Sequence, residues 1–259
     1  MNAQIFGTPA LEGQEVRVHP ISNPLDWQRL APLAVDPRQL EQQLIVSFQR
    51  RHPAAVAFDI MRTKLLQDAR EKQWSQIGIT APTAGCGKAT VAANLAISLA
   101  KHEKLRVGLI DLDLRHPRIA EIFDHDGAFG TDDFLRGECN VQDYLVRLGD
   151  NLAIGASPRP ASFPAELLHG PRAAQTLTRL RGELGANIII YNLPALLDSD
   201  DCLGLLPLME ASLLVVGAEQ SKVADVDVCE RELQERTQLL GVVLNKCRYP
   251  AESYLNFQN

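Results

Sequence analysis

Aromatic residues are scarce in this sequence, since they make up only 5% of its 259 residues. Aliphatic side chains must therefore form most of any core, as they do in the buried strands of parallel sheets. No stretch reaches the roughly 20 apolar residues that a membrane-spanning helix needs, and the N-terminus lacks the basic and apolar regions of a signal peptide. These absences lead us to expect a cytoplasmic protein.

Paired cysteines and an excess of positive charge are also missing. The five cysteines are scattered and none forms a CxxC pair, so neither a zinc site nor a disulfide framework is indicated. The net charge is −6, which argues against nucleic acid as the main partner. The sequence therefore favours a reducing compartment and no nucleic-acid partner.

Composition and periodicity divide the chain into four segments. The first contains four prolines and no sustained periodicity, which predicts an extended or disordered arm. The second has helical periodicity, and the third alternates apolar strands with helices. The predicted divisions are the arm over 1–35, N-terminal helices over 36–75, a main domain over 76–247 and a short tail over 248–259.

Two helices are predicted in the N-terminal segment. Asp36 followed by a proline is typical of a helix start, and predicts a helix over 37–51. A second helix is predicted over 54–73, after the proline at position 53. The apolar positions expected on one face of the first helix are Leu40, Leu44, Ile45 and Phe48. These helices contact either a partner or their own domain, because an amphipathic face alone names no partner.

The main domain is predicted to be an α/β domain. Alternating strands and helices imply a mainly parallel central sheet covered on both faces, which is a three-layer sandwich preceded here by the N-terminal helices. The predicted strands lie over 76–80, 106–112, 152–155, 186–192, 212–217 and 239–245. The predicted helices lie over 88–102, 117–123, 164–183, 201–209 and 223–236.

The most informative motif lies over residues 80–90, between an apolar strand and a helical pattern. A small-residue loop with glycines and a lysine in this setting is typical of a phosphate-binding loop, or P-loop, whose N–H groups face the phosphates at a helix start. Lys88 would reach the terminal phosphates. The main domain is thus predicted to have the P-loop NTPase fold and to bind ATP or ADP. The predicted nucleotide contacts are Ala84, Gly85, Cys86, Gly87, Lys88, Ala89, Thr90 and Asn245.

Two carboxylates end the strand over 106–112. Asp111 and Asp113 are two residues apart, so both side chains point to one side of the strand end, where open α/β sheets bind ligands. They can hold a hydrated Mg²⁺ or accept a proton from a nucleophile. We therefore predict Asp111 and Asp113 as the metal site, and Lys88, Asp111 and Asp113 as the catalytic residues.

Two positions of the expected magnesium site lack the usual ligand. Ala89 stands where a P-loop carries a Ser or Thr hydroxyl, and the hydroxyl of Thr90 lies about 100° further round the helix. Asn192 stands where an acid at a strand end would complete a magnesium and water site. The sequence therefore predicts a weakened Mg²⁺ site.

Three further polar residues have open alternatives. Asp200 and Asp201, in an acidic run after the strand over 186–192, either support the metal site or cap the next helix. Asn245, at the end of the last strand, either contacts a nucleobase or forms a turn.

Together these motifs resemble the bacterial tyrosine autokinases of capsule and exopolysaccharide biosynthesis, which are deviant P-loop ATPases. The resemblance covers about residues 50–247, most of the chain, and is most specific over 109–117, the second nucleotide motif. It also rests on the segments over 58–64, 163–168, 192–201 and 241–246.

The resemblance implies ATP and Mg²⁺ binding, with Lys88 on the phosphates and Asp111 and Asp113 serving the metal and a tyrosine hydroxyl. It further implies autophosphorylation on C-terminal tyrosines of a neighbouring subunit. The implied partner is the cytoplasmic segment of a membrane polysaccharide co-polymerase, which would hold the chain at the inner face of the membrane.

The chain departs from this family at several positions besides Ala89 and Asn192. The helix that contacts a second subunit keeps Arg62, but has Val56 and Asp59 where the family has Glu and Arg. Tyr249 and Tyr254 in the tail are separated and form no cluster. These departures put phosphoryl transfer and the subunit contact in doubt.

These departures favour an ATP-binding P-loop protein that regulates exopolysaccharide or capsule polymerisation and export, with weakened or absent kinase activity. An active protein-tyrosine autokinase and a partitioning-type positioning ATPase are the main alternatives, and an interaction module without nucleotide is a third. Labelled ATP, ATP-dependent dimerisation and calorimetry with ADP discriminate among them.

Overall fold

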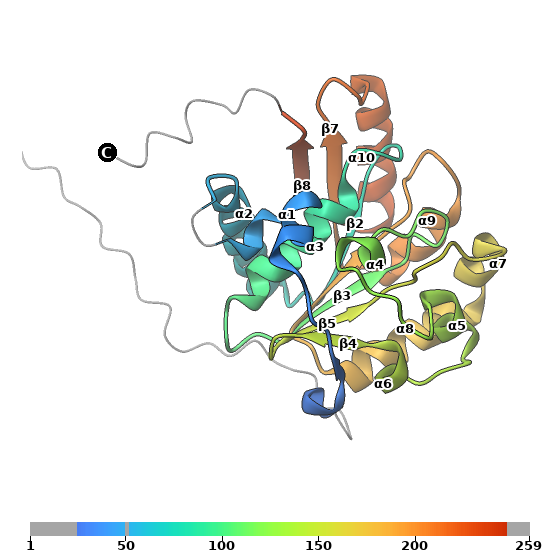
Figure 1. Cartoon of the computed structure of the whole chain (residues 1–259). Helices are drawn as coiled ribbons and strands as arrows, with labels where there is room; N and C mark the ends of the chain where they lie inside the picture. The colour runs from blue at the N-terminus through green and yellow to red at the C-terminus, as the bar shows by residue number, and fades with distance from the viewer. Residues whose placement is uncertain (1–24, 50–51, 248–259) are drawn as a thin grey trace, which may run out of the picture.

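An eight-stranded sheet runs through the middle of the molecule (Figure 1). The structure is a computed structural model that describes residues 25–49 and 52–247. The strand order is β1-β4-β5-β3-β6-β2-β7-β8, and all neighbours are parallel except β4 and β5. The strands are β1 (Ala31–Pro32), β2 (Gln76–Thr80), β3 (Val107–Asp111), β4 (Val146–Leu148), β5 (Leu152–Gly155), β6 (Ile188–Asn192), β7 (Ala211–Gly217) and β8 (Gln238–Asn245).

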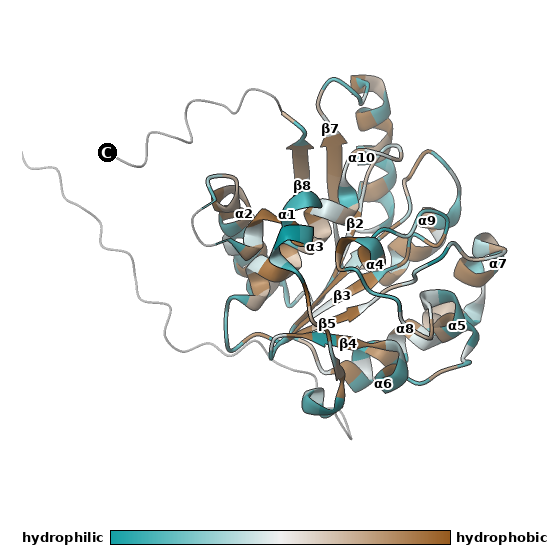
Figure 2. Cartoon of the chain, viewed as in Figure 1, coloured by the Kyte–Doolittle hydropathy of each residue, from teal (hydrophilic) through white to brown (hydrophobic). Residues whose placement is uncertain are grey.

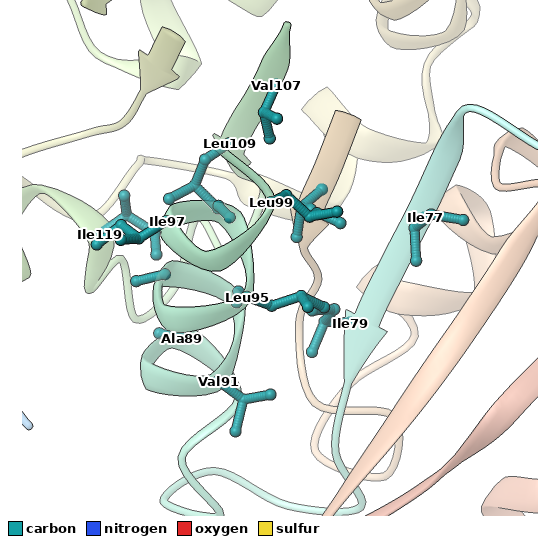
Figure 3. Close-up of a cluster of buried hydrophobic side chains, with 14 of the residues drawn as sticks. Ile77, Ile79, Ala89, Val91, Leu95, Ile97, Leu99, Val107, Leu109 and Ile119 are labelled. Atoms are coloured by element: carbon teal, nitrogen blue, oxygen red, sulfur yellow. The ribbon is translucent and has the colours of Figure 1, made fainter. Parts of the chain in front are cut away.

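Helices cover both faces of this sheet, each over its own apolar cluster. In one cluster, Ile77 and Ile79 of β2 pack against Leu95 and Leu99 of α3 (Figure 3). The second cluster joins the other face to α5–α10. The helices are α1 (Pro37–Gln42), α2 (Ala55–Lys72), α3 (Lys88–Ala100), α4 (Ile119–Ile122), α5 (Thr131–Arg136), α6 (Val141–Tyr144), α7 (Pro164–His169), α8 (Pro171–Leu184), α9 (Asp201–Leu205) and α10 (Val223–Arg236), with 3₁₀ turns η1 (Trp27–Arg29), η2 (Val46–Phe48) and η3 (Leu206–Leu208). The predicted three-layer α/β fold is therefore confirmed.

The central strands are apolar, as burial between two helical layers requires. β7 is hydrophobic along most of its length (Figure 2), and all of its residues are buried. β3 and β6 are buried at every position as well. These strands and α2 lie where the sequence predicts them, within two residues.

The predicted helix over 37–51 is wrong, because α1 ends at Gln42 and the chain turns at Leu44, whose φ is +60°. The cause is a polar side chain of α3. Asn94 Nδ2 donates to the carbonyl oxygen of Leu44 at 3.0 Å, and its Oδ1 accepts from the Ser47 N–H at 2.8 Å. Consequently Leu44 and Phe48 are exposed, while Leu40 and Ile45 are buried as predicted.

Other helix predictions need shorter corrections. The helix predicted over 164–183 is two helices, α7 and α8, because Gly170 is extended and Pro171 starts a new helix. The helix predicted over 201–209 is α9 followed by the 3₁₀ turn η3, which contains a proline, and the one over 117–123 is only the short α4. The sequence patterns do not predict α5, α6, β1 or β4, which are all six residues or shorter.

The part of the predicted arm that the structure describes is packed. Trp27 is buried and its Nε1 donates to the carbonyl oxygen of Leu184 at 2.8 Å, while β1 pairs with β4. Residues 25–35 therefore form an edge of the domain, because Trp27 and Leu30 bury apolar surface there. The rest of the arm, and the tail with Tyr249 and Tyr254, lie outside the described residues.

Membrane-spanning character is absent from the helices of residues 25–49 and 52–247, since none of them is both long enough and apolar enough to cross a bilayer.

Candidate functional site

The site lies at the carboxyl ends of the parallel strands, which meet at one edge of the sheet. The P-loop, residues 80–87, follows β2 and leads into α3. Gly85 and Gly87 have φ values of +84° and +91°, which only glycine adopts readily. A Cβ at Gly87 would collide with Asn245 Nδ2, so the last strand lies directly against the loop. The predicted strand–loop–helix setting is present.

The loop is held from both sides. On the β6 side, the N–H of Ala84 donates to Asp198 Oδ2 at 2.7 Å. On the β7 and β8 side, Gln220 Nε2 donates to the carbonyl oxygen of Ala84 at 3.2 Å, and Asn245 Nδ2 donates to that of Cys86 at 2.9 Å. Asn245 is thus bound to the loop itself, and its role against a nucleobase stays a prediction.

Lys88 crosses from the start of α3 to the end of β3. Its Nζ forms an ion pair with Asp113 Oδ2, and both residues are buried. The other oxygen of Asp113 accepts from the His116 N–H at 3.1 Å. Lys88 and Asp113, one of the two carboxylates predicted for the metal site, therefore lie next to each other, and their charges are neutralised.

Asp111 lies beside this pair and is almost fully buried. Its Oδ2 accepts from the N–H groups of Arg118 and Ile119, both at 2.9 Å, at the start of α4. Its Oδ1 accepts from Asn192 Nδ2 at 2.7 Å and from the Asp113 N–H at 3.2 Å. Burial raises the pKa of Asp111, although the hydrogen bonds from Ile119 and Asn192 act against this. Asp111 therefore holds the loop between β3 and α4, and its role as a metal ligand stays a prediction.

Asn192 and Asp111 face each other across neighbouring strands. They are register partners in the β3–β6 pair. The amide nitrogen of Asn192 is bound to Asp111, whereas its buried Oδ1 has no hydrogen-bond partner among the described residues. An amide here donates to the carboxylate, where an acid would repel it. Asn192, which stands where an acid is expected from the sequence, thus stabilises the buried Asp111 by a hydrogen bond.

Position 89, the second residue of α3, carries no hydroxyl. Ala89 is buried within the apolar cluster of Figure 3. Thr90 is partly exposed, and its carbonyl oxygen accepts from Asn94 Nδ2 at 2.9 Å. The structure therefore places all predicted loop residues together, with the side chain of Ala89 turned into the core.

The acidic run after β6 has roles that the sequence leaves open. Asp201 is fully buried and pairs with Arg115, whose Nη2 lies 3.1 Å from Asp201 Oδ1. Asp200 precedes α9, and its side chain accepts no capping hydrogen bond. Asp201 therefore ties the loop after β3 to the loop after β6. The sequence gives no sign of the contacts of Asp198 and Gln220 with the P-loop.

Arg62 of α2, for which the resemblance implies a contact with a second subunit, is hydrogen-bonded within its own chain. Its Nη1 lies 2.9 Å from Asp59 Oδ1 and 3.1 Å from the carbonyl oxygen of Ser98. Burial acts to raise the pKa of Asp59, but the hydrogen bond from Ser98 and the charges of Lys101 and Arg62 outweigh it, so this pKa is lowered. The network fastens α2 to α3.

Asp59→Asn should lower the free energy of unfolding at pH 7 by less than about 1 kcal/mol, since these ion pairs are partly exposed. A lowered pKa stabilises the folded state above the ordinary value of 3.8, and this contribution is lost as the pH falls through the folded-state pKa. The difference between variant and parent in urea unfolding should therefore shrink at acid pH. Asp68→Asn on the same helix is the control, and a pH-independent difference would contradict the prediction.

Comparison with known proteins finds similarity to P-loop NTPases and to bacterial tyrosine-protein kinases. The ParA family model, described as NUBPL iron-transfer P-loop NTPase, matches residues 74–137. The "Putative tyrosine-protein kinase EpsB" of Ralstonia solanacearum is 29% identical over 213 residues, which are 80% of this chain and 28% of that protein. The tyrosine-protein kinase YwqD of Bacillus subtilis is 24% identical over 212 residues, which are 80% of this chain and 87% of that protein. The chain thus spans about a quarter of the EpsB relative and most of YwqD.

Solved structures show the same fold. The chimerical protein CapA2B2 has a TM-score of 0.72 and 25% identity, and the match covers 80% of this chain and 91% of that one. The septum site-determining protein MinD of Pyrococcus horikoshii, complexed with Mg-ADP, has a TM-score of 0.54 and 21% identity, with 70% and 76% coverage. The chain therefore carries a ParA-like P-loop NTPase domain, and its curated homologues are bacterial tyrosine-protein kinases.

Proposed function

We propose that this chain binds ATP or ADP and regulates exopolysaccharide or capsule polymerisation and export, with weak or absent phosphoryl transfer. The observation that carries the proposal is the combination of a P-loop and Lys88 with Ala89 and Asn192 at the two metal-site positions. The similarity to EpsB and YwqD supports the biological setting.

Nucleotide binding rests on the P-loop. Its N–H groups at the start of α3 and the Lys88 ammonium provide the positive potential that phosphates need. The fold is shared with MinD, which is complexed with Mg-ADP in its structure. We propose that Lys88 contacts the phosphates of a bound nucleotide while it stays beside Asp113.

The residues at the expected metal site are poor ligands for a divalent cation. Ala89 offers no oxygen, and both oxygens of Asp111 already accept two hydrogen bonds each. Asn192 Oδ1 has no hydrogen-bond partner among residues 25–49 and 52–247, but it carries no charge. Hard cations such as Mg²⁺ prefer charged oxygens and regular geometry. We therefore propose that nucleotide binding depends little on Mg²⁺.

Two measurements test the proposal, which are calorimetry with nucleotide and incubation with labelled ATP and Mg²⁺. We expect calorimetry to detect nucleotide binding, with affinities in Mg²⁺ and in EDTA that agree within about threefold, because the loop and Lys88 carry the interaction. We expect the label on Tyr249 and Tyr254 to stay at the background of a Lys88→Met control. Strong label above that control would instead identify an active protein-tyrosine autokinase.

The partner and location are proposed from the resemblance. We propose that a cytoplasmic segment of a membrane polysaccharide co-polymerase, or a second subunit, contacts the N-terminal helices, and that this contact holds the protein at the inner face of the membrane. Val56 and Ile60, one turn apart on α2, are exposed and offer an apolar surface for it. Nucleic acid is not among the proposed partners, given the net charge of −6.

A further inference from the structure

The strand order divides the site into an acidic half and an amide half. β6 and β3 lie on one side of β2, and β7 and β8 lie on the other. The first half carries Asp111, Asp113 and Asp198, whereas the second presents the amides of Gln220 and Asn245 to the loop. A nucleotide along the P-loop would therefore have three carboxylates toward one end and, toward the other, two amides with Lys246, whose Nζ lies 3.4 Å from Gln220 Oε1.

Lys88 shows which end of a nucleotide meets the acidic half. The P-loop lysine contacts the outer phosphates of a bound nucleotide, and here its ammonium lies at Asp113, on the β3 side. An outermost phosphate on Lys88 would therefore lie over the acidic half, where Asp198 Oδ2 accepts from the N–H of Ala84 at 2.7 Å.

The position of Asp198 is fixed by its neighbours. The segment after β6 runs along the start of the P-loop and is bonded to it through backbone groups at 2.8–3.0 Å. These bonds run from the N–H groups of Leu193, Leu196 and Leu197 to the carbonyl oxygens of Ile79, Ala81 and Pro82. The ion pair of buried Asp201 with the exposed Arg115 holds the far end of the segment. The exposed Asp198 carboxylate thus accepts a hydrogen bond from a backbone N–H of the loop, and the chain before it is held in place.

We propose that Asp198 makes this site select a nucleoside diphosphate over the triphosphate, an inference that rests on the proposed nucleotide binding. A third phosphate would compete with Asp198 for the Ala84 N–H and bring negative charge close to the Asp198 carboxylate. Lys88 is a single positive charge shared with Asp113, and Ala89 provides no cation ligand that would offset the repulsion. A diphosphate ends short of Asp198 and avoids this repulsion.

Calorimetric titrations with ADP and ATP in EDTA test the inference on the full chain. The parent should bind ADP at least about tenfold more tightly than ATP, because like charges at short range oppose the third phosphate. Asp198→Asn keeps an acceptor for the Ala84 N–H but removes the charge, so it should strengthen ATP binding and bring the ratio within about threefold. Asp200→Asn makes the same charge change two residues away, without contact to the loop, and should keep the parental ratio.

The possible outcomes separate this inference from the proposed function. Equal affinities of the parent for ADP and ATP, or an unchanged ratio in Asp198→Asn, would overturn the selectivity while leaving nucleotide binding intact. Equal effects of Asp198→Asn and Asp200→Asn would show a general charge effect and overturn the role of Asp198. Binding of neither nucleotide by the folded parent would overturn both.

Discussion

Asn192→Asp should make the stability of this protein depend on divalent cations. Asn192 and Asp111 are register partners on β6 and β3, and both are buried. The variant would place two carboxylates where Asn192 Nδ2 now donates to Asp111 Oδ1 at 2.7 Å. Without a cation, the lost hydrogen bond and the new repulsion should lower the free energy of unfolding by about 3 kcal/mol.

Magnesium should recover much of this loss in the variant alone. Ligand binding to the folded state stabilises it by RT ln(1 + [L]/Kd), so urea unfolding with and without Mg²⁺ measures the effect directly. Asn192→Leu removes the same hydrogen bond without adding charge, and should be destabilised but indifferent to Mg²⁺. Equal Mg²⁺ responses of parent, Asp and Leu variants would contradict the account of this position.

The pH dependence gives Asn192→Asp a second signature. Burial already raises the pKa of Asp111, and a neighbouring carboxylate would raise it further. A raised pKa means that the folded state binds the proton more tightly than the unfolded state does. The variant should therefore lose stability relative to the parent as the pH rises above the ordinary value of 3.8 toward the folded-state pKa.

The sequence predicts the parts of the site that local patterns determine. Apolar runs locate the central strands, and the spacing of Gly85, Gly87 and Lys88 locates the loop. The two-residue spacing of Asp111 and Asp113 predicts one side of the strand end for both, and the structure pairs Asp113 with Lys88. In each case residues close in the chain carry the information, because strand and helix periods act over a few residues.

What the sequence cannot predict comes from contacts between distant segments. The break after α1 depends on Asn94, which lies 50 residues beyond Leu44. The contact of Asp198 with Ala84 joins residues 114 apart, and requires the order in which β6 and β2 are paired. Several arrangements of parallel strands satisfy the same apolar pattern, so these polar contacts follow only from the observed sheet order.

Lys88→Met should separate the two roles of this lysine. The variant keeps a long apolar side chain but removes the charge, so nucleotide affinity should fall by about 10- to 100-fold, the range for charge-assisted hydrogen bonds. Stability should fall too, by about 3 kcal/mol, because Asp113 would remain as a buried carboxylate without its cation.

A second substitution distinguishes these effects. Asp113→Asn removes the uncompensated charge and keeps an oxygen that accepts from the His116 N–H. The double variant Lys88→Met with Asp113→Asn should therefore recover most of the lost stability in urea unfolding, yet bind ADP no better than Lys88→Met in calorimetry. If Lys88→Met bound ADP as tightly as the parent does, contact of Lys88 with the phosphates would be contradicted. The Lys88 ammonium would then serve only to neutralise Asp113.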